Sequence, residues 1–320
     1  MNRSSQALLR AGSVPDKSDP GDLRWRRRRD GGVGLLELLI TVAILSIVMI
    51  GITDLMFRYE RSYTGAAQLA DLNGGIQGAM VLLAQEIAQA GALPSQDPTL
   101  ATPTLAQAVA AGTETVTLSS VAGLYNGERI EVDPGGSPEA VTIIGDPNTS
   151  TNQITATFAN SHSAGVPVMA NGVIAGGVLP TSTATTLYLI GDLDGNGALD
   201  YVRYTCDTQT GQFLRSEIEN PTSASVFPAD DVIVSGLEAN ANGAPCFQYT
   251  TQALGGTNYI IDVAITLTAQ SLTANPVTGQ ATQVQNRFLN VAPRNMLTAA
   301  ALAQSDPGKD LQATPPNLPE

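Results

Sequence analysis

The segment GGVGLLELLITVAILSIVMIGIT, from Gly31 to Thr53, decides what this chain can be. Its apolar run has about the 20 residues that a helix needs to cross a bilayer. Its only charged residue is Glu37, close to its start. A carboxylate inside a membrane costs free energy, so such a residue normally has a partner and a function. The segment therefore predicts a membrane-spanning helix with a functional carboxylate.

The residues on both sides of this segment predict its orientation. Four consecutive arginines, residues 26–29, precede it, and segments rich in Lys and Arg stay in the cytoplasm. We therefore expect a single-pass inner-membrane protein whose C-terminal body is extracytoplasmic. The alternative is a cleaved secretory signal, which needs a small-x-small site after a short apolar core. The sequence DLMFRYE, Asp54 to Glu60, follows instead and favours a helix that continues.

The start of the segment resembles the class III signal of type IV prepilins. The match consists of Gly32, then Val33, and Glu37 at the fifth position after the glycine, with basic residues upstream. The resemblance implies that prepilin peptidase removes residues 1–32 as a leader and methylates the new N-terminus at Val33. It also implies that Glu37 neutralises the N-terminal amine of a neighbouring subunit, which would give this carboxylate a cationic partner.

The segment departs from the family pattern at three points. Val33 stands where phenylalanine is usual, Asp30 is close to the cut, and the leader is long. The cut could instead follow Gly31. The alternative to a prepilin signal is an ordinary anchor in which Glu37 extends to the membrane interface.

Hydrophobic periodicity predicts an α+β fold that starts with a long helix. Residues 33–53 would form its membrane-spanning part, and residues 54–92 its amphipathic part. One face of the amphipathic part carries an apolar stripe at helical spacing, formed by Ile76, Met80, Leu83 and Ile87. We expect this stripe to pack on an antiparallel sheet, and the helix to end near Gly91.

The rest of the chain is typical of short strands. Residues 112–170 alternate Thr, Val and Ile between turn signals and predict an inserted small β-unit. Residues 171–295 predict the main β-sheet head, with a meander of antiparallel strands and a late hairpin of Thr257–Ala269 with Gln283–Val291. Residues 302–320 contain four prolines and predict a disordered tail.

Two features of the predicted head resemble minor pilins of the PilW class and related minor pseudopilins. One is the long final strand, which ends before Arg294 and Asn295. The other is an Asp-Gly-Asn-Gly hairpin followed by Gly-x-x-Leu-Arg. The resemblance implies a type IV pilin-like fold, in which a long N-terminal helix packs on an antiparallel β-sheet head.

The net charge and the cysteine content argue against some classes of function. The net charge is −13, and half of the 16 Lys and Arg residues lie in residues 1–32, so the body is strongly acidic. Nucleic-acid binding needs clustered basic residues, so we expect no direct nucleic acid partner.

The two cysteines, Cys206 and Cys246, lack the spacing of metal ligands, so they predict one disulfide in an exported body. The single histidine, His162, lies in a turn and predicts a structural role.

The stretch DLDGNGALD, residues 192–200, places oxygen atoms at alternating positions, as the first half of an EF-hand loop does. The candidate calcium ligands are Asp192, Asp194, Asn196, the carbonyl of Ala198, and Asp200. The twelfth position, normally glutamate, is Arg203, and no flanking helix is predicted, so the stretch is not an EF-hand. A calcium-binding hairpin loop and a plain Asx- and Gly-rich turn both remain open.

Together these features favour a structural minor subunit of a type IV pilus that primes or caps the filament. Its implied partners are prepilin peptidase, the major and other minor pilins, the inner-membrane assembly platform and the membrane, and its final location is the pilus or cell surface. The alternative is a minor pseudopilin of a type II secretion system. A membrane-anchored enzyme is a third reading, but the sequence shows no nucleophile with a base, no phosphate loop and no histidine-bearing metal set.

Overall fold

The computed structural model describes residues 34–94, 102–170, 172–254, 257–305 and 311–319. The chain divides into two compact units, Met1–Phe57 and Arg58–Glu320. The predicted leader and the predicted cleavage site between Gly32 and Val33 lie outside the described residues.

The first unit contains the start of helix α1, which spans Leu35–Gln89 over 55 residues. The carbonyl oxygen of Gly34 accepts the N–H groups of Glu37 at 2.8 Å and of Leu38 at 3.1 Å, which closes the first turn. Every side chain from Leu35 to Phe57 is exposed, and most of them are apolar. Among the described residues, α1 is the one helix long and apolar enough to cross a membrane.

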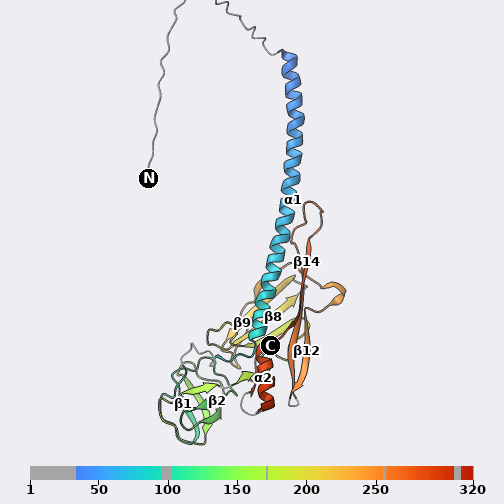
Figure 1. The fold of residues 1–320 in the computed structure, drawn as a ribbon. Coiled ribbons are helices and arrows are strands. Elements are labelled where there is room, and N and C mark those ends of the chain that lie inside the picture. The colour runs from blue at the N-terminus through green and yellow to red at the C-terminus, as the bar shows by residue number, and fades with distance from the viewer. Residues whose placement is uncertain (1–33, 95–101, 171, 255–256, 306–310, 320) are drawn as a thin grey trace, which may run out of the picture. The chain divides into compact units, whose positions relative to one another are not determined.

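In the second unit, α1 buries the apolar stripe that the sequence predicts. The stripe residues, each 0% exposed, are Ile76, Met80, Leu83 and Ile87. They share one hydrophobic core with Tyr204 and Phe213 from one sheet and Ile265 from another. Burying each such side chain contributes about 1.5–3 kcal/mol. Packing on the sheets therefore holds this part of the helix in place (Figure 1).

Two antiparallel four-stranded sheets form the head. The first has the order β10-β9-β8-β7, which confirms the predicted meander, and in the second β13 pairs with β11, β12 and β14. The predicted late hairpin is confirmed as β13 with β14. The first sheet consists of β7 Thr186–Gly191, β8 Asp200–Asp207, β9 Gln212–Glu219 and β10 Asp231–Ser235. The second consists of β11 Leu237–Glu238, β12 Phe247–Leu254, β13 Thr257–Gln270 and β14 Gln283–Val291.

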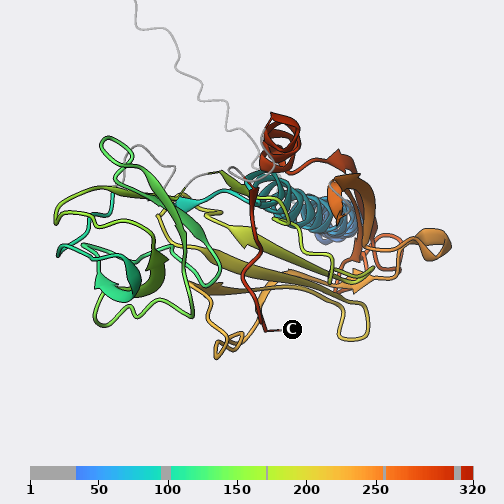
Figure 2. The same cartoon turned by 90° about the horizontal axis from the view of Figure 1, so that it is seen from below.

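Residues 112–170 form small sheets of their own, which gather at one side of the first sheet (Figure 2). One sheet pairs β1 Gly112–Thr117 with β4 Gln153–Phe158, and the other has the order β3-β2-β5, with β2 Arg129–Val132, β3 Glu139–Thr142 and β5 Val168–Ala170. Their buried side chains, such as Ile130 and Phe158, share a core with Tyr188 and Tyr201 of the first sheet. The inserted strands therefore complete the core of the head.

The C-terminal segment differs from the prediction of a disordered tail over residues 302–320. Helix α2 spans Arg294–Ser305, and β15 Leu311–Gln312 pairs in parallel with β6 Val173–Ile174. The hydroxyl of Tyr125 donates to the carbonyl oxygen of Ala313 at 2.9 Å, and that of Tyr201 donates to Pro319 at 2.8 Å. Both tyrosines are distant from this segment in the sequence, so its proline-rich composition alone does not reveal these contacts.

The described part of the head also contains a short 3-10 helix, η2, which spans Ala241–Gly243.

Candidate functional site

Glu37 lies in the first turn of α1, with its side chain exposed. A helix N-terminus carries partial positive charge, which favours a carboxylate in the first turn. The exposed position leaves the Glu37 carboxylate accessible to a group from another molecule. Gly32 and Val33, the other residues of the predicted signal, lie outside the described residues.

The end of α1 is fixed by backbone contacts at Gly91, close to where the sequence predicts it. The N–H of Gly91 donates to the carbonyl oxygen of Ile190 at 2.8 Å, and its own carbonyl accepts the N–H of Ile174 at 3.0 Å. Gly91 has a φ of +85°, and a Cβ there would lie 2.4 Å from the carbonyl oxygen of Ile174. Only glycine satisfies both the dihedral angle and the close approach.

A buried ionic network holds the helix against the first sheet. The carboxylate of Glu86 on α1 accepts a hydrogen bond from the hydroxyl of Tyr204 at 2.7 Å and one from Arg215 Nη2 at 2.7 Å. Arg215 Nη1 also donates to Glu217 at 2.7 Å. Burial, reinforced by the charge of Glu86, raises the pKa of Tyr204 well above its usual range. Sequence reasoning missed this network, although Glu86 lies three positions after Leu83 of the apolar stripe.

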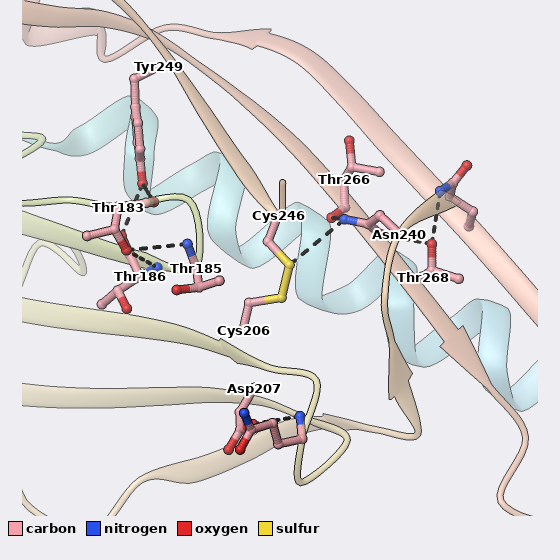
Figure 3. The surroundings of a disulfide bond; sticks show 12 residues. Thr183, Thr185, Thr186, Cys206, Asp207, Asn240, Cys246, Tyr249, Thr266 and Thr268 are labelled. Carbon is pink, nitrogen blue, oxygen red and sulfur yellow. Dashed lines mark hydrogen bonds between the residues drawn. A yellow bond between two sulfur atoms is a disulfide. The ribbon is translucent and has the colours of Figure 1, made fainter. Parts of the chain in front are cut away.

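The predicted disulfide is present, and it joins the two sheets (Figure 3). Cys206 lies on β8, Cys246 lies just before β12, and both are buried. Beside the bridge, Asn240 Nδ2 donates to the carbonyl oxygen of Thr266 at 2.8 Å, and Asn240 Oδ1 accepts from the Thr268 hydroxyl at 2.9 Å. The segment between β11 and β12 is therefore tied to β13 as well as to β8.

His162 makes a structural contact. It is buried, and its Nε2 lies 2.9 Å from Glu139 Oε2. Although burial opposes ionisation, hydrogen bonds from Ala159, His162 and Asn160 lower the pKa of Glu139. The histidine and its carboxylate therefore pin the turn at residue 162 to β3.

The loop between β7 and β8 brings together three of the five predicted calcium ligands. Carboxylate oxygens of Asp192, Asp194 and Asp200 all lie within 4.8 Å of one another. The side chain of Asn196 is turned to its own loop, because its Oδ1 accepts the N–H of Ala198 at 2.7 Å and its Nδ2 donates to Asp194 at 3.0 Å.

Burial separates these three carboxylates. Asp194 is exposed, whereas Asp192 is 7% and Asp200 is 0% exposed. Burial, together with the nearby charges of Glu217, Asp194 and Asp192, raises the pKa of Asp200 to about 7. Burial also raises the pKa of Asp192. The loop therefore concentrates negative charge in a partly buried place.

Comparison with known proteins bears on the N-terminal segment. Residues 27–53 match the family model of the prokaryotic N-terminal methylation motif, a stretch that includes Gly32, Val33 and Glu37. No curated protein and no solved structure matches the chain. With an apolar helix that begins within this motif and an antiparallel sheet head, the chain is a prepilin-like protein that carries the methylation motif of the type IV pilin and pseudopilin superfamily.

Proposed function

We propose that this protein is a minor subunit of a type IV pilus, of the PilW class, which prepilin peptidase cuts after Gly32 and methylates at Val33. The observation that carries the proposal is the methylation motif at residues 27–53, because it contains the start of an apolar helix whose first turn holds Glu37. The role is structural, and the protein works by assembly with other subunits.

The surface of the first part of α1 supports assembly through this helix. The side chains from Leu35 to Phe57 are exposed and mostly apolar, so they need apolar surroundings. The inner membrane supplies these before assembly, and the helices of major and other minor pilins supply them afterwards. In such surroundings an unpartnered carboxylate would cost about 2.5–3.5 kcal/mol at a central depth and less near the end of the segment, where Glu37 lies. The amine of a neighbouring subunit's Val33 would remove that cost by pairing with it.

The size of the head supports a position at the filament tip. The second unit spans Arg58–Glu320 and includes the additional strands of residues 112–170. Heads in a shaft must pack side by side around the helical core, and an enlarged head fits more easily at an end. We therefore place this subunit in a tip complex that primes assembly on the inner-membrane platform.

The test follows the protein from the membrane into sheared filaments, with Glu37→Gln as the variant. Glu60→Gln is the matched control, because Glu60 is an exposed glutamate on the same helix beyond the apolar segment. Wild type and Glu60→Gln should appear in filaments and in complexes with other minor pilins. Glu37→Gln should be cut normally but remain in the membrane. A wild-type chain that reaches neither filaments nor such complexes would refute the proposal.

The same motif suits a minor pseudopilin of a type II secretion system, so the experiment needs a second readout. Deleting the gene should remove surface pili and leave protein secretion intact. A deletion that stops secretion while pili persist would assign the subunit to the secretion machine.

A further inference from the structure

We propose that residues 192–200 bind one calcium ion through the carboxylates of Asp192, Asp194 and Asp200. Oxygens of these three side chains lie within 4.8 Å of one another, close enough to contact a common cation. Carboxylates at such distances repel each other when they are ionised, most strongly the two that are buried, Asp192 and Asp200. The ion pairs found among the described residues involve other carboxylates, those of Glu86, Glu139, Glu217 and Asp230.

An independent observation at Asp200 also points to a ligand. Its side chain is 0% exposed, and its Oδ2 accepts the N–H of Leu193 at 2.9 Å. Its other oxygen, Oδ1, is buried and has no hydrogen-bond partner. A buried acceptor without a partner destabilises the fold, and does so more when it is charged. A cation held with Asp192 and Asp194 would satisfy that oxygen and offset the repulsion at once.

The backbone on both sides of the site is held in place without the ion. At the first end, the N–H of Asp192 donates to the carbonyl oxygen of Ala92 at 2.9 Å, just after α1. At the other end, Asn220 accepts the N–H of Leu199 at 3.3 Å and donates its own N–H to the Leu199 carbonyl at 2.7 Å. A loop anchored in this way loses less conformational freedom when it binds an ion.

The chemistry of the ligands favours calcium among the common divalent ions. The cluster offers only oxygen atoms, whereas zinc prefers nitrogen and sulfur. Magnesium demands a near-ideal octahedron, while calcium accepts six to eight oxygens in flexible geometry and takes water where the protein supplies too few. Asp194 is exposed, so water can complete the shell. Calcium at this place would lock the β7–β8 loop, which contacts the segment after α1 through Asp192.

Calcium titration of the full-length chain in detergent, after chelation of bound metal, tests this inference. We expect calorimetry to give a Kd of about 10⁻⁴–10⁻³ M, as for extracellular calcium modules. At about 100 times that Kd the melting temperature should rise by several degrees. Absence of both heat and a melting shift would overturn the inference. An equal shift with magnesium would overturn the assignment to calcium.

Two variants and a control locate the site. Asp194→Asn changes an exposed residue, so it should fold normally and weaken calcium binding by about tenfold or more, because affinity follows ligand charge. In Asp200→Asn, calcium should no longer raise the melting temperature, and the melting temperature without calcium should be higher than that of wild type. The amide keeps an acceptor for Leu193 and places a donor beside the two other carboxylates. Asp231→Asn, an exposed change on β10 at the opposite edge of the sheet, should keep the full shift. If calcium raised the melting temperatures of Asp194→Asn and Asp200→Asn as much as that of wild type, the site would be refuted.

Discussion

The side-chain amide of Asn295 donates a hydrogen bond to the carbonyl oxygen of Gln89 at 2.9 Å, across 206 residues of sequence. The same amide also lies 3.2 Å from the carbonyl oxygen of Ala90. The last carbonyl groups of a helix have no partner within the helix. The start of α2 therefore caps the end of α1 and connects the C-terminal part of the head to this helix.

Replacing this cap should destabilise the head measurably. Asn295→Ala should lower the free energy of unfolding by about 1 kcal/mol, because the carbonyl of Ala90 loses this donor while that of Gln89 still accepts the N–H of Ala92 at 3.0 Å. Thr298→Ala, an exposed change one turn later on α2, should stay within about 0.5 kcal/mol of wild type. Denaturant unfolding of both variants measures the difference. Equal losses would show that Asn295 does not act as a cap.

The network around Glu86 predicts unequal effects for the two carboxylates that bind Arg215. Glu86 is 5% exposed, and removing it leaves Nε and Nη2 of Arg215 and the Tyr204 hydroxyl without their acceptor, while Nη1 of Arg215 keeps Glu217. Glu86→Ala should therefore cost about 3–5 kcal/mol of unfolding free energy. Glu217 has a side chain that is 32% exposed, so Glu217→Ala should cost less than about 1 kcal/mol. Similar costs for both would contradict this account of the network.

The disulfide closes a loop between residues 40 positions apart. By chain entropy alone, a cross-link of this length stabilises the folded state by about 3–4 kcal/mol. The double change Cys206→Ser with Cys246→Ser should lower the free energy of unfolding by that amount. Wild-type protein under reducing conditions is the control and should match the variant. A variant as stable as the oxidised protein would show that the bridge adds no stability.

Glu128 predicts how stability changes with pH. Its side chain is 0% exposed, its Oε2 accepts the N–H of Tyr125 at 3.0 Å, and burial raises its pKa to about 8. In the unfolded chain the pKa is about 4.3. Between these values the folded protein holds a proton that the unfolded chain releases. The free energy of unfolding should therefore fall as pH rises from about 5 to about 8, and then level off.

The matched variant for this prediction is Glu128→Gln, which keeps an acceptor for Tyr125 and cannot ionise. It should reduce the decline of the unfolding free energy across that pH range, since Asp200, whose pKa is raised to about 7, still contributes to it, and make the protein more stable than wild type at pH 8. Unfolding curves at several pH values measure both. The same slope in the variant and in wild type would assign the pH dependence to other groups.

Local patterns were enough to predict much of the fold. The stripe from Ile76 to Ile87 has a helical period, and the structure buries it as predicted. The strand predicted at Gln283–Val291 has the bounds of β14. These elements could be predicted because hydrophobic spacing along one segment determines which face is buried.

Contacts between distant segments could not be predicted in this way. The tail was predicted to be disordered from its prolines, yet in its described part, residues 311–319, the carbonyl groups of Ala313 and Pro319 accept hydrogen bonds from the hydroxyls of Tyr125 and Tyr201. The cap by Asn295 depends on where two helices meet, which no local pattern encodes. At the acidic loop, the spacing pointed to Asp192, Asp194 and Asp200, but only the folded chain shows that Asp200 is buried with an unpartnered oxygen.

The position of the cut can be separated from the neighbouring alternative by paired variants. Gly31→Leu and Gly32→Leu place the same bulky side chain one residue apart. If the peptidase cuts after Gly32, Gly32→Leu should block processing and Gly31→Leu should leave the mature mass unchanged. The reverse pattern would move the cut to Gly31.

The central claim is that this chain enters the pilin assembly pathway, and the mature N-terminus tests it most directly. Intact mass and N-terminal sequencing should be compared between cells with and without prepilin peptidase. The account predicts a chain that begins at methylated Val33 only when the peptidase is present. An uncut chain in both strains, or the same cut in both, would contradict it.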